Sequence, residues 1–209
     1  MERISLKDSG IESAAQRAAD VLRSGGIVLF PTDTLYGLGA DALSDAAVMK
    51  IFSVKGRNVG KRMHSIVSGI AMAREYGIIP PIVETLSQEL SKGKITFIVQ
   101  KRNFNTGIMN GPETFGFRIP DNEFCIDLLR IFGGPITATS ANTAGAPPAN
   151  DVDSILAQLG DANIDLVIDA GALPARAPST VLDVSGESPK ILRESAVSAD
   201  EIARFLPNL

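Results

Sequence analysis

The sequence has one cysteine, one histidine and no tryptophan among its 209 residues, and these scarcities narrow the chemistry open to it. A single cysteine excludes an internal disulfide and a cysteine-based zinc cluster. Cys125 has apolar neighbours and is expected in the core. The single histidine, His64, argues against an Asp-His-Ser triad and a histidine-based metal site. We therefore expect no protein-bound metal centre.

Long apolar runs are also missing. No run approaches the roughly 20 residues that cross a bilayer, and the first residues lack the apolar core of a signal peptide. We expect a cytoplasmic protein without a membrane partner. The net charge of −4 argues against a general polyanion-binding protein, although residues 50–62 carry lysines and arginines but no acid.

Two common phosphate-binding motifs are absent as well. The chain has no Gly-x-x-x-x-Gly-Lys-Ser/Thr and no Gly-x-Gly-x-x-Gly after a strand, so Walker and Rossmann phosphate sites are unsupported. With 44% hydrophobic and 21% charged residues, the composition is that of an ordinary globular protein. Neither repeats nor a linker interrupt the chain, and we expect a single domain over residues 1–209.

Apolar periodicity and turn residues predict interleaved strands and helices. Several strands follow one another through short turns, which favours an α/β fold with a twisted mixed sheet and flanking helices over an all-parallel sheet. The expected strands are 27–30, 65–67, 94–100, 114–119, 136–139, 166–169, 180–184 and 190–193. The expected helices are 11–24, 45–55, 70–76, 82–90, 123–132, 153–159 and 199–205.

Residues 26–39 (Gly-Ile-Val-Leu-Phe-Pro-Thr-Asp-Thr-Leu-Tyr-Gly-Leu-Gly) place polar groups at the end of a buried strand. The strand stops at Pro31, and two threonines, an acid and two glycines precede the next helix-like segment; a plain strand-to-helix turn is the alternative to a binding site here. Gly37 and Gly39 are expected to permit backbone conformations or close approaches that other residues exclude. Hydroxyls and a carboxylate at the exit of a buried strand are typical of a small-molecule site.

Other segments supply complementary chemistry. Ser140 and Asn142 could donate hydrogen bonds to phosphate, and Arg118 could pair with a carboxylate, because a buried guanidinium requires an anion. A Lys-x-Arg at a helix end is more often a solvated surface pair. The combination nevertheless fits a nucleoside triphosphate held without a P-loop, its phosphates facing three cations: Lys55, Arg57 and Lys61.

Taken in this order, the segments resemble the YrdC family, whose best-known activity is threonylcarbamoyl-AMP synthesis. The first and fourth of the six matching stretches are specific as a pair, and all six lie within residues 25–193. The chain is similar to the short, single-domain form of the family. The matching stretches are Pro31–Leu38, Lys55–Arg57 with Lys61, Phe117–Asp121, Thr139–Gly145, Pro178–Asp183 and Ile191–Arg193.

The resemblance implies a twisted YrdC-like sheet with a large concave face, and a nucleotidyltransferase reaction. L-threonine and bicarbonate would form a carbamate that attacks the α-phosphate of ATP, with Mg²⁺ on the triphosphate, to give threonylcarbamoyl-AMP and pyrophosphate. A threonylcarbamoyl transferase complex would then use the product for the t6A37 modification of tRNA. The resemblance also implies binding of tRNA or other double-stranded RNA by the concave face.

The resemblance further implies roles for individual residues. The catalytic residues would be Lys55 and Arg57, which face the triphosphate with Lys61. Threonine would be held by Thr34, Arg118, Thr180 and the backbone of Ala138. The nucleotide would be contacted by Lys61, Thr114, Ser140, Asn142 and Arg193.

Three departures from the family pattern alter the nucleotide side of the groove more than the fold. Residues 58–64 read Asn-Val-Gly-Lys-Arg-Met-His, so Arg62 and His64 replace the usual Pro and Ser. Residues 92–94 are Lys-Gly-Lys where Pro-Gly-Pro is usual, and residues 148–150 are Pro-Ala-Asn where Ser-Pro-Thr is usual. The last change removes a hydroxyl expected near the nucleotide.

Two other functions are open to the sequence. One is a non-catalytic RNA-binding or ribosome-assembly protein of the same fold, which the acidic net charge and the strand arginine disfavour. The other is a carbamoyl-transfer module of the hydrogenase-maturation type, which the lack of zinc-finger and acylphosphatase-like segments disfavours.

Overall fold

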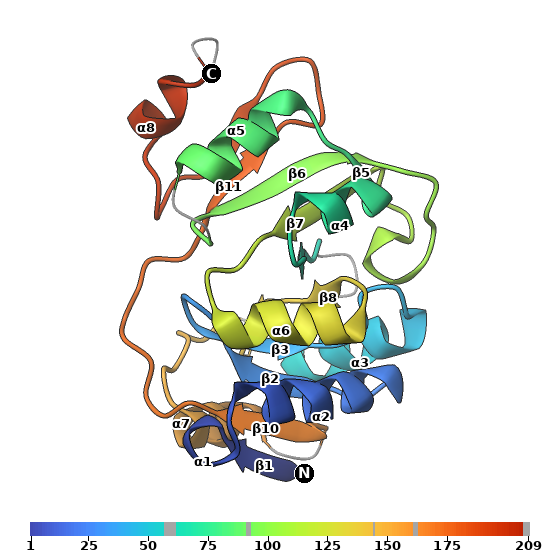
Figure 1. Cartoon of the computed structure of the whole chain (residues 1–209), viewed down its shortest axis with the longest axis vertical. Helices are drawn as coiled ribbons and strands as arrows, with labels where there is room; N and C mark the ends of the chain where they lie inside the picture. Colours follow the sequence, from blue (N-terminus) through green and yellow to red (C-terminus); the bar gives the residue numbers. More distant parts are fainter. Residues whose placement is uncertain (57–61, 91–92, 144, 161–162, 207–209) are drawn as a thin grey trace.

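The computed structural model describes residues 1–56, 62–90, 93–143, 145–160 and 163–206, which form two sheets with helices packed around them (Figure 1). The first sheet has five strands. Its first three strands are parallel, and the last two pair antiparallel with their neighbours. Their order is β1 (Glu2–Ser5), β10 (Leu166–Asp169), β2 (Val28–Pro31), β3 (Tyr36–Gly39) and β9 (Thr139–Ser140).

The second sheet is also mixed. The long strand β6 pairs parallel with β11 and antiparallel with β7. A short strand, β5 (Gly77–Ile78), pairs with the far end of β6. The main order is β12 (Lys190–Arg193), β11 (Thr180–Asp183), β6 (Ile95–Lys101), β7 (Thr114–Arg118), β4 (Ser65–Ile66) and β8 (Ile136–Thr137).

Residues 136–140 join the two sheets at a corner. Ile136 and Thr137 pair with β4 in the second sheet, whereas the next strand, β9, pairs with β3 in the first. The Thr137 amide also donates to the Ala40 carbonyl at 2.9 Å. The predicted mixed α/β fold is confirmed, but its strands divide into two sheets, because this short segment changes partner after Ala138.

Alternation along β2 shows how helices cover both faces of the first sheet. Val28 and Phe30 belong to a core with α2 (Ile11–Arg23) and α6 (Glu123–Phe132). Ile27 and Leu29 belong to a core with α3 (Asp45–Lys55) and α7 (Val152–Leu159). A strand covered on both faces reads as a continuous apolar run, which is what residues 27–30 are.

The second sheet is covered on one face. Ile95, Phe97 and Val99 of β6 pack in a core with α4 (Ile70–Tyr76), α5 (Pro81–Glu89) and α8 (Ala199–Ala203). A short α1 (Leu6–Ser9) follows β1, and a 3₁₀ turn, Gly107–Met109, precedes β7. The alternate residues Thr96 and Ile98 point to the opposite face, which turns toward the first sheet and forms a cavity wall.

The segment after Pro31 is not a strand-to-helix turn, the alternative that the sequence left open, because β2 and β3 form an antiparallel hairpin. Neither Gly37 nor Gly39 has a positive φ. Gly39 is required by packing, since a Cβ there would lie 2.4 Å from the Phe30 ring. At Gly37 a Cβ would make only ordinary contacts of 3.6 Å.

Most other predicted elements are confirmed, with ends shifted by a residue or two. The sequence pattern did not predict β1, α1 or β5, which are four residues or shorter. Cys125 is buried as expected: its Sγ lies 3.3 Å from the Pro31 carbonyl, and burial raises its pKa. Among the described residues, no helix has the length and apolarity needed to span a membrane.

Candidate active site

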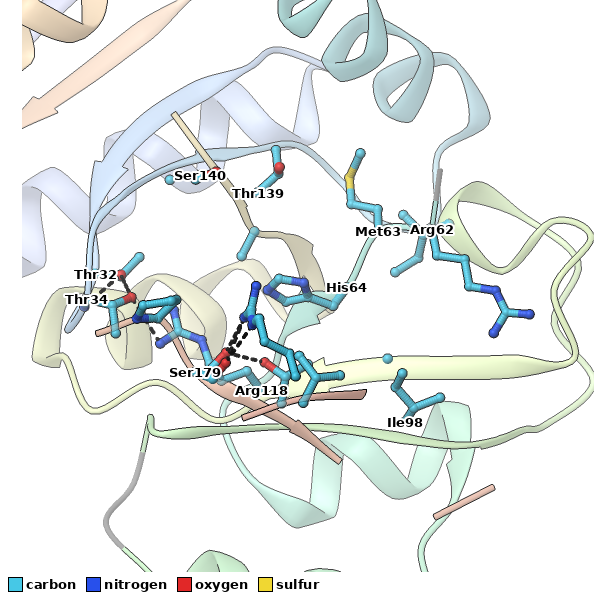
Figure 2. Close-up of a pocket in the computed structure, with 18 of the residues that line it drawn as sticks. Thr32, Thr34, Arg62, Met63, His64, Ile98, Arg118, Thr139, Ser140 and Ser179 are labelled. Atoms are coloured by element: carbon cyan, nitrogen blue, oxygen red, sulfur yellow. Dashed lines mark hydrogen bonds between the residues drawn. The ribbon is translucent and has the colours of Figure 1, made fainter. Parts of the chain in front are cut away.

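A cavity of about 750 Å³ lies between the two sheets (Figure 2). One wall is the β2–β3 hairpin with β9, and the other is the uncovered face of β6, β7 and β11. The segment 62–64 and the coil leading to β11 close two further sides. The volume falls in the range of roughly 300–1,000 Å³ that is typical of small-molecule sites.

The cavity wall is positively charged although the protein is acidic. It includes four arginines and the only histidine, and none of its described residues is an aspartate or glutamate. The whole chain carries a net charge of −4, so the separation of charge is local. Clustered cations in a concave, partly dehydrated site favour an anionic ligand. The cations are Arg62, Arg118, Arg176 and Arg193, and the histidine is His64.

Hydroxyl groups gather at the hairpin end of the cavity. The Thr32 Oγ1 donates to the Leu35 carbonyl at 2.7 Å and accepts from the Thr34 amide at 3.1 Å, which fixes the turn. The Thr34 Oγ1 lies 3.2 Å from the Thr32 Oγ1 and 3.5 Å from Nη1 of Arg118. In Figure 2 these two threonines lie close to Arg118 and Ser179. The hairpin thus presents a hydroxyl beside a guanidinium.

Arg118 ends β7 and is buried, as its strand position suggested, but the protein supplies an anion for it. Nη1 donates to both carboxylate oxygens of Asp33, at 2.9 and 3.0 Å, and both side chains are 5% exposed. Because Arg118 also lines the cavity, the ion pair lies directly behind the wall.

A second guanidinium near that of Arg118, the guanidinium of Arg193, is held in place by Ser179. Nε and Nη2 of Arg193 donate to the Ser179 carbonyl at 3.1 and 2.7 Å. Loss of hydration lowers the pKa of Arg193, and the positive charge of Arg118 lowers that pKa further. A bound anion would relieve the repulsion between the two cations.

The opposite end of the cavity carries the residues that depart from the family pattern. Arg62 donates from Nη1 to the Thr114 Oγ1 at 3.3 Å. His64 lies between this end and Arg118 (Figure 2). Both Arg62 and His64 line the cavity, so the substitutions add a guanidinium and an imidazole where the usual residues are Pro and Ser.

Lys55 is placed differently from Arg118. It is 4% exposed, is absent from the described cavity wall, and donates from Nζ to the Ser140 carbonyl and, at 2.7 Å, to the Asn142 carbonyl. The Asn142 Oδ1 accepts from the Ser140 Oγ at 2.5 Å, and Nδ2 donates to the Ala146 carbonyl at 2.6 Å. Lys55 and Asn142 thus fix the loop that brings Ser140 to the cavity.

The side chain of Thr180 points away from the cavity, so the predicted role of Thr180 in threonine binding does not fit the structure. Its Oγ1 donates to the Val197 carbonyl at 2.7 Å and accepts from the amides of Ser195 and Val197, each at 3.0 Å. Its strand neighbours Ser179 and Val181 line the cavity instead, because alternate residues of a strand face opposite sides.

The other predicted site residues divide into those in the wall and those outside the described chain. Arg57 and Lys61 lie outside the described residues. Asp33, Arg176 and Ser179 were not predicted from the sequence, and only the register of β11 could have indicated Ser179. The wall includes Thr34, Thr114, Arg118, Ala138, Ser140 and Arg193 from the predicted set.

Comparison with known proteins gives one consistent family. The model of the Sua5/YciO/YrdC family, described as "Telomere recombination", matches residues 20–195. A mouse threonylcarbamoyl-AMP synthase is 32% identical over 192 residues, which cover 88% of this chain and 68% of the relative. A Bacillus subtilis enzyme of the same name is 32% identical over 189 residues, covering 89% of this chain and 54% of the relative.

Solved structures agree with the sequence relatives. Pyrococcus abyssi Sua5, solved with L-threonine, has a TM-score of 0.89 at 28% identity. The match covers 100% of this chain and 61% of that protein. Escherichia coli YciO shares the fold, with a TM-score of 0.82 at 23% identity over 96% of this chain and 98% of that protein.

Proposed function

The chain belongs to the Sua5/YciO/YrdC family, and we propose that it is a threonylcarbamoyl-AMP synthase that acts on L-threonine, bicarbonate and ATP. The observation that carries the proposal is the charge of the cavity. Four arginines and a histidine face a space with no described acid, which suits a ligand rich in phosphate and carboxylate.

The threonine would bind at the hairpin end. Arg118 would pair with its carboxylate, and Thr34 and the backbone of Ala138 would contact the rest of the amino acid. Thr34 and Arg118 lie within 3.5 Å of each other, so one small zwitterion can touch both. Ser179 replaces Thr180 in this assignment, because only Ser179 lines the cavity.

The nucleotide would occupy the remaining length of the cavity. Ser140, Thr114 and Arg193 would contact it, Arg62 adds positive charge at that end, and His64 adds an imidazole that can hydrogen-bond. Lys55 and Asn142 would act by holding the Ser140 loop. Arg57 and Lys61 remain proposed phosphate ligands on the strength of the family pattern.

The reaction would be a nucleotidyl transfer in two steps. The threonine amine and bicarbonate first condense to a carbamate with loss of water. A carbamate oxygen then bonds to the α-phosphorus of ATP, the bond to the bridging oxygen breaks, and pyrophosphate leaves. Positioning by Thr34 and Arg118, with positive charge around the phosphates, is the catalysis that this cavity offers.

Magnesium is expected with ATP, but the described residues do not make a site for it. Neither a carboxylate in the cavity wall nor a group of three or more His, Cys, Asp or Glu side chains is found among the described residues. Mg²⁺ prefers carboxylate, phosphate and water oxygens. We therefore treat Mg²⁺ as part of the incoming triphosphate complex and assign it no step.

The adenylate product is a mixed anhydride and needs an acceptor. We propose that a threonylcarbamoyl transferase complex takes it for t6A37 modification of tRNA in the cytoplasm. Binding of double-stranded RNA by this chain remains a prediction.

Pyrophosphate release tests the proposal. The protein is incubated with ATP, Mg²⁺, L-threonine and bicarbonate, and each component is omitted in turn. Release that requires both threonine and bicarbonate supports the synthase, and release that ignores threonine or never occurs refutes it. Arg118→Ala should abolish the threonine-dependent release of pyrophosphate. Glu84→Gln, which breaks an exposed ion pair between α4 and α5, is the matched control.

A further inference from the structure

The carboxylate of Asp33 does not line the cavity, yet it contacts the arginine that we assign to the threonine carboxylate. Both of its oxygens accept from Nη1 of Arg118, at 2.9 and 3.0 Å. The same nitrogen donates to the Gly93 carbonyl at 3.1 Å. Among the described residues, Nη1 is therefore the guanidinium nitrogen that makes the hydrogen bonds to the protein.

The other edge of this guanidinium is left for a ligand. Within the described part of the chain, neither Nε nor Nη2 of Arg118 donates a hydrogen bond, although the side chain lines the cavity. Nε and Nη2 form a fork that matches the two oxygens of a carboxylate. We propose that Asp33 is a positioning residue, which holds Nη1 from behind and so directs the Nε–Nη2 edge toward the substrate carboxylate.

The surroundings of Asp33 leave its carboxylate little freedom. Gly93 has a φ of +79°, and a Cβ there would lie 2.1 Å from the Asp33 Oδ2. Only glycine fits this position, both for its backbone and for the space. On the other side, Arg176 donates from Nη1 to the Asp33 carbonyl at 3.1 Å. A carboxylate held in this way can fix the orientation of its partner.

A direct role for Asp33 as the base that deprotonates threonine does not fit this geometry. Its side chain is 5% exposed, and both oxygens face a guanidinium. A general base must reach the proton that it removes, directly or through one water. Asp33 would have to leave Arg118 to do so, and its effect on substrate therefore passes through Arg118.

Two quantities test the role of Asp33: the Kd for threonine, measured by calorimetry, and the KM for threonine, which alone rests on the proposed function. The Asp33→Asn substitution keeps the shape of the side chain and removes its charge. We expect the Kd and KM for threonine to rise about tenfold, with the KM for ATP nearly unchanged. Glu84→Gln, which removes an exposed carboxylate partner of Arg74, should change neither constant.

A double-mutant cycle separates positioning from direct contact. Threonine binding by Asp33→Asn/Arg118→Gln should equal that of Arg118→Gln alone, because Asp33 acts through Arg118. If Asp33→Asn alone does not fold, the comparison of the double variant with Arg118→Gln still tests the role of Asp33, since both of these variants lack the ion pair. Gly93→Ala should weaken threonine binding in the same way as Asp33→Asn.

Three results would overturn the inference. These are an unchanged threonine Kd in Asp33→Asn, a further loss when Asp33→Asn is added to Arg118→Gln, and a Gly93→Ala variant that binds threonine normally. Failure of the synthase proposal would look different: the wild-type protein would bind threonine but release no pyrophosphate. A wild-type protein that does not bind threonine would refute both.

Discussion

Lys55→Met separates two roles for a buried lysine. The ammonium group donates to the carbonyls of Ser140 and Asn142 from a side chain that is 4% exposed. Methionine has a similar length and no donor, so both carbonyls lose a charged partner. Hydrogen bonds to charged groups contribute about 1.5–3 kcal/mol each, and carbonyls left without a partner keep their desolvation cost. We expect the free energy of unfolding to fall by about 3 kcal/mol.

Chemical and thermal unfolding measure this change. For a chain of this size, a loss of about 3 kcal/mol corresponds to a Tm lower by about 6–12 °C. Lys50→Met is the matched control on the same helix. The Lys50 Nζ donates to one carbonyl, that of Gly25, at 2.7 Å from an exposed position. Its loss should change stability by no more than about 1 kcal/mol.

Activity completes the experiment. If Lys55 holds the Ser140 loop, Lys55→Met should lose stability and turnover together. If Lys55→Met keeps the stability of the wild type but loses turnover, the loop-holding account is refuted, and Lys55 acts on the triphosphate as the family pattern implies.

Three further variants test single features. Thr180→Val should lower the free energy of unfolding by about 1–3 kcal/mol, because the hydroxyl bonded to Val197 is lost, while the KM for threonine stays unchanged; a raised KM would return Thr180 to the site. Gly39→Ala should lower Tm, since its Cβ would overlap the Phe30 ring, and an unchanged Tm would contradict this packing. Burial raises the pKa of Tyr36 from 10.0 to about 12, so the folded state binds the phenol proton more tightly than the unfolded state does. The free energy of unfolding should therefore fall as the pH rises from about 10 to 12. Tyr36→Phe should flatten this pH dependence, and an unaltered dependence would contradict the assignment.

Local patterns identified most elements of the fold. Alternation and capping signals placed α6 at Glu123–Phe132 and β10 at Leu166–Asp169, where the structure has them. Strand β3 was not predicted, because the Thr-Asp-Thr turn is equally suited to precede a helix or a second strand. Tyr36–Gly39 become a strand because they pair with both β2 and β9, and β9 lies about a hundred positions away in the sequence.

The types of residue at the site could be predicted from the sequence, but most of their contacts could not. A buried Arg118 was predicted to need an anion, but its partner Asp33 lies 85 residues away and is brought close only where the two sheets meet. Thr180 and Ser179 are neighbours in one motif, and only the register of β11 shows which faces the cavity. Contacts of this kind depend on tertiary packing, which residue spacing does not encode.

Mass spectrometry of the product formed with carbon-13 bicarbonate shows whether the protein makes threonylcarbamoyl-AMP. We expect a threonine adenylate that carries the isotope, because the carbon of the bridging carbamate comes from bicarbonate. Its yield should fall in Arg118→Ala and stay at the wild-type level in Glu84→Gln. An unlabelled threonine adenylate would contradict the proposed reaction. So would the absence of any adenylate when the pure protein is present in stoichiometric amounts.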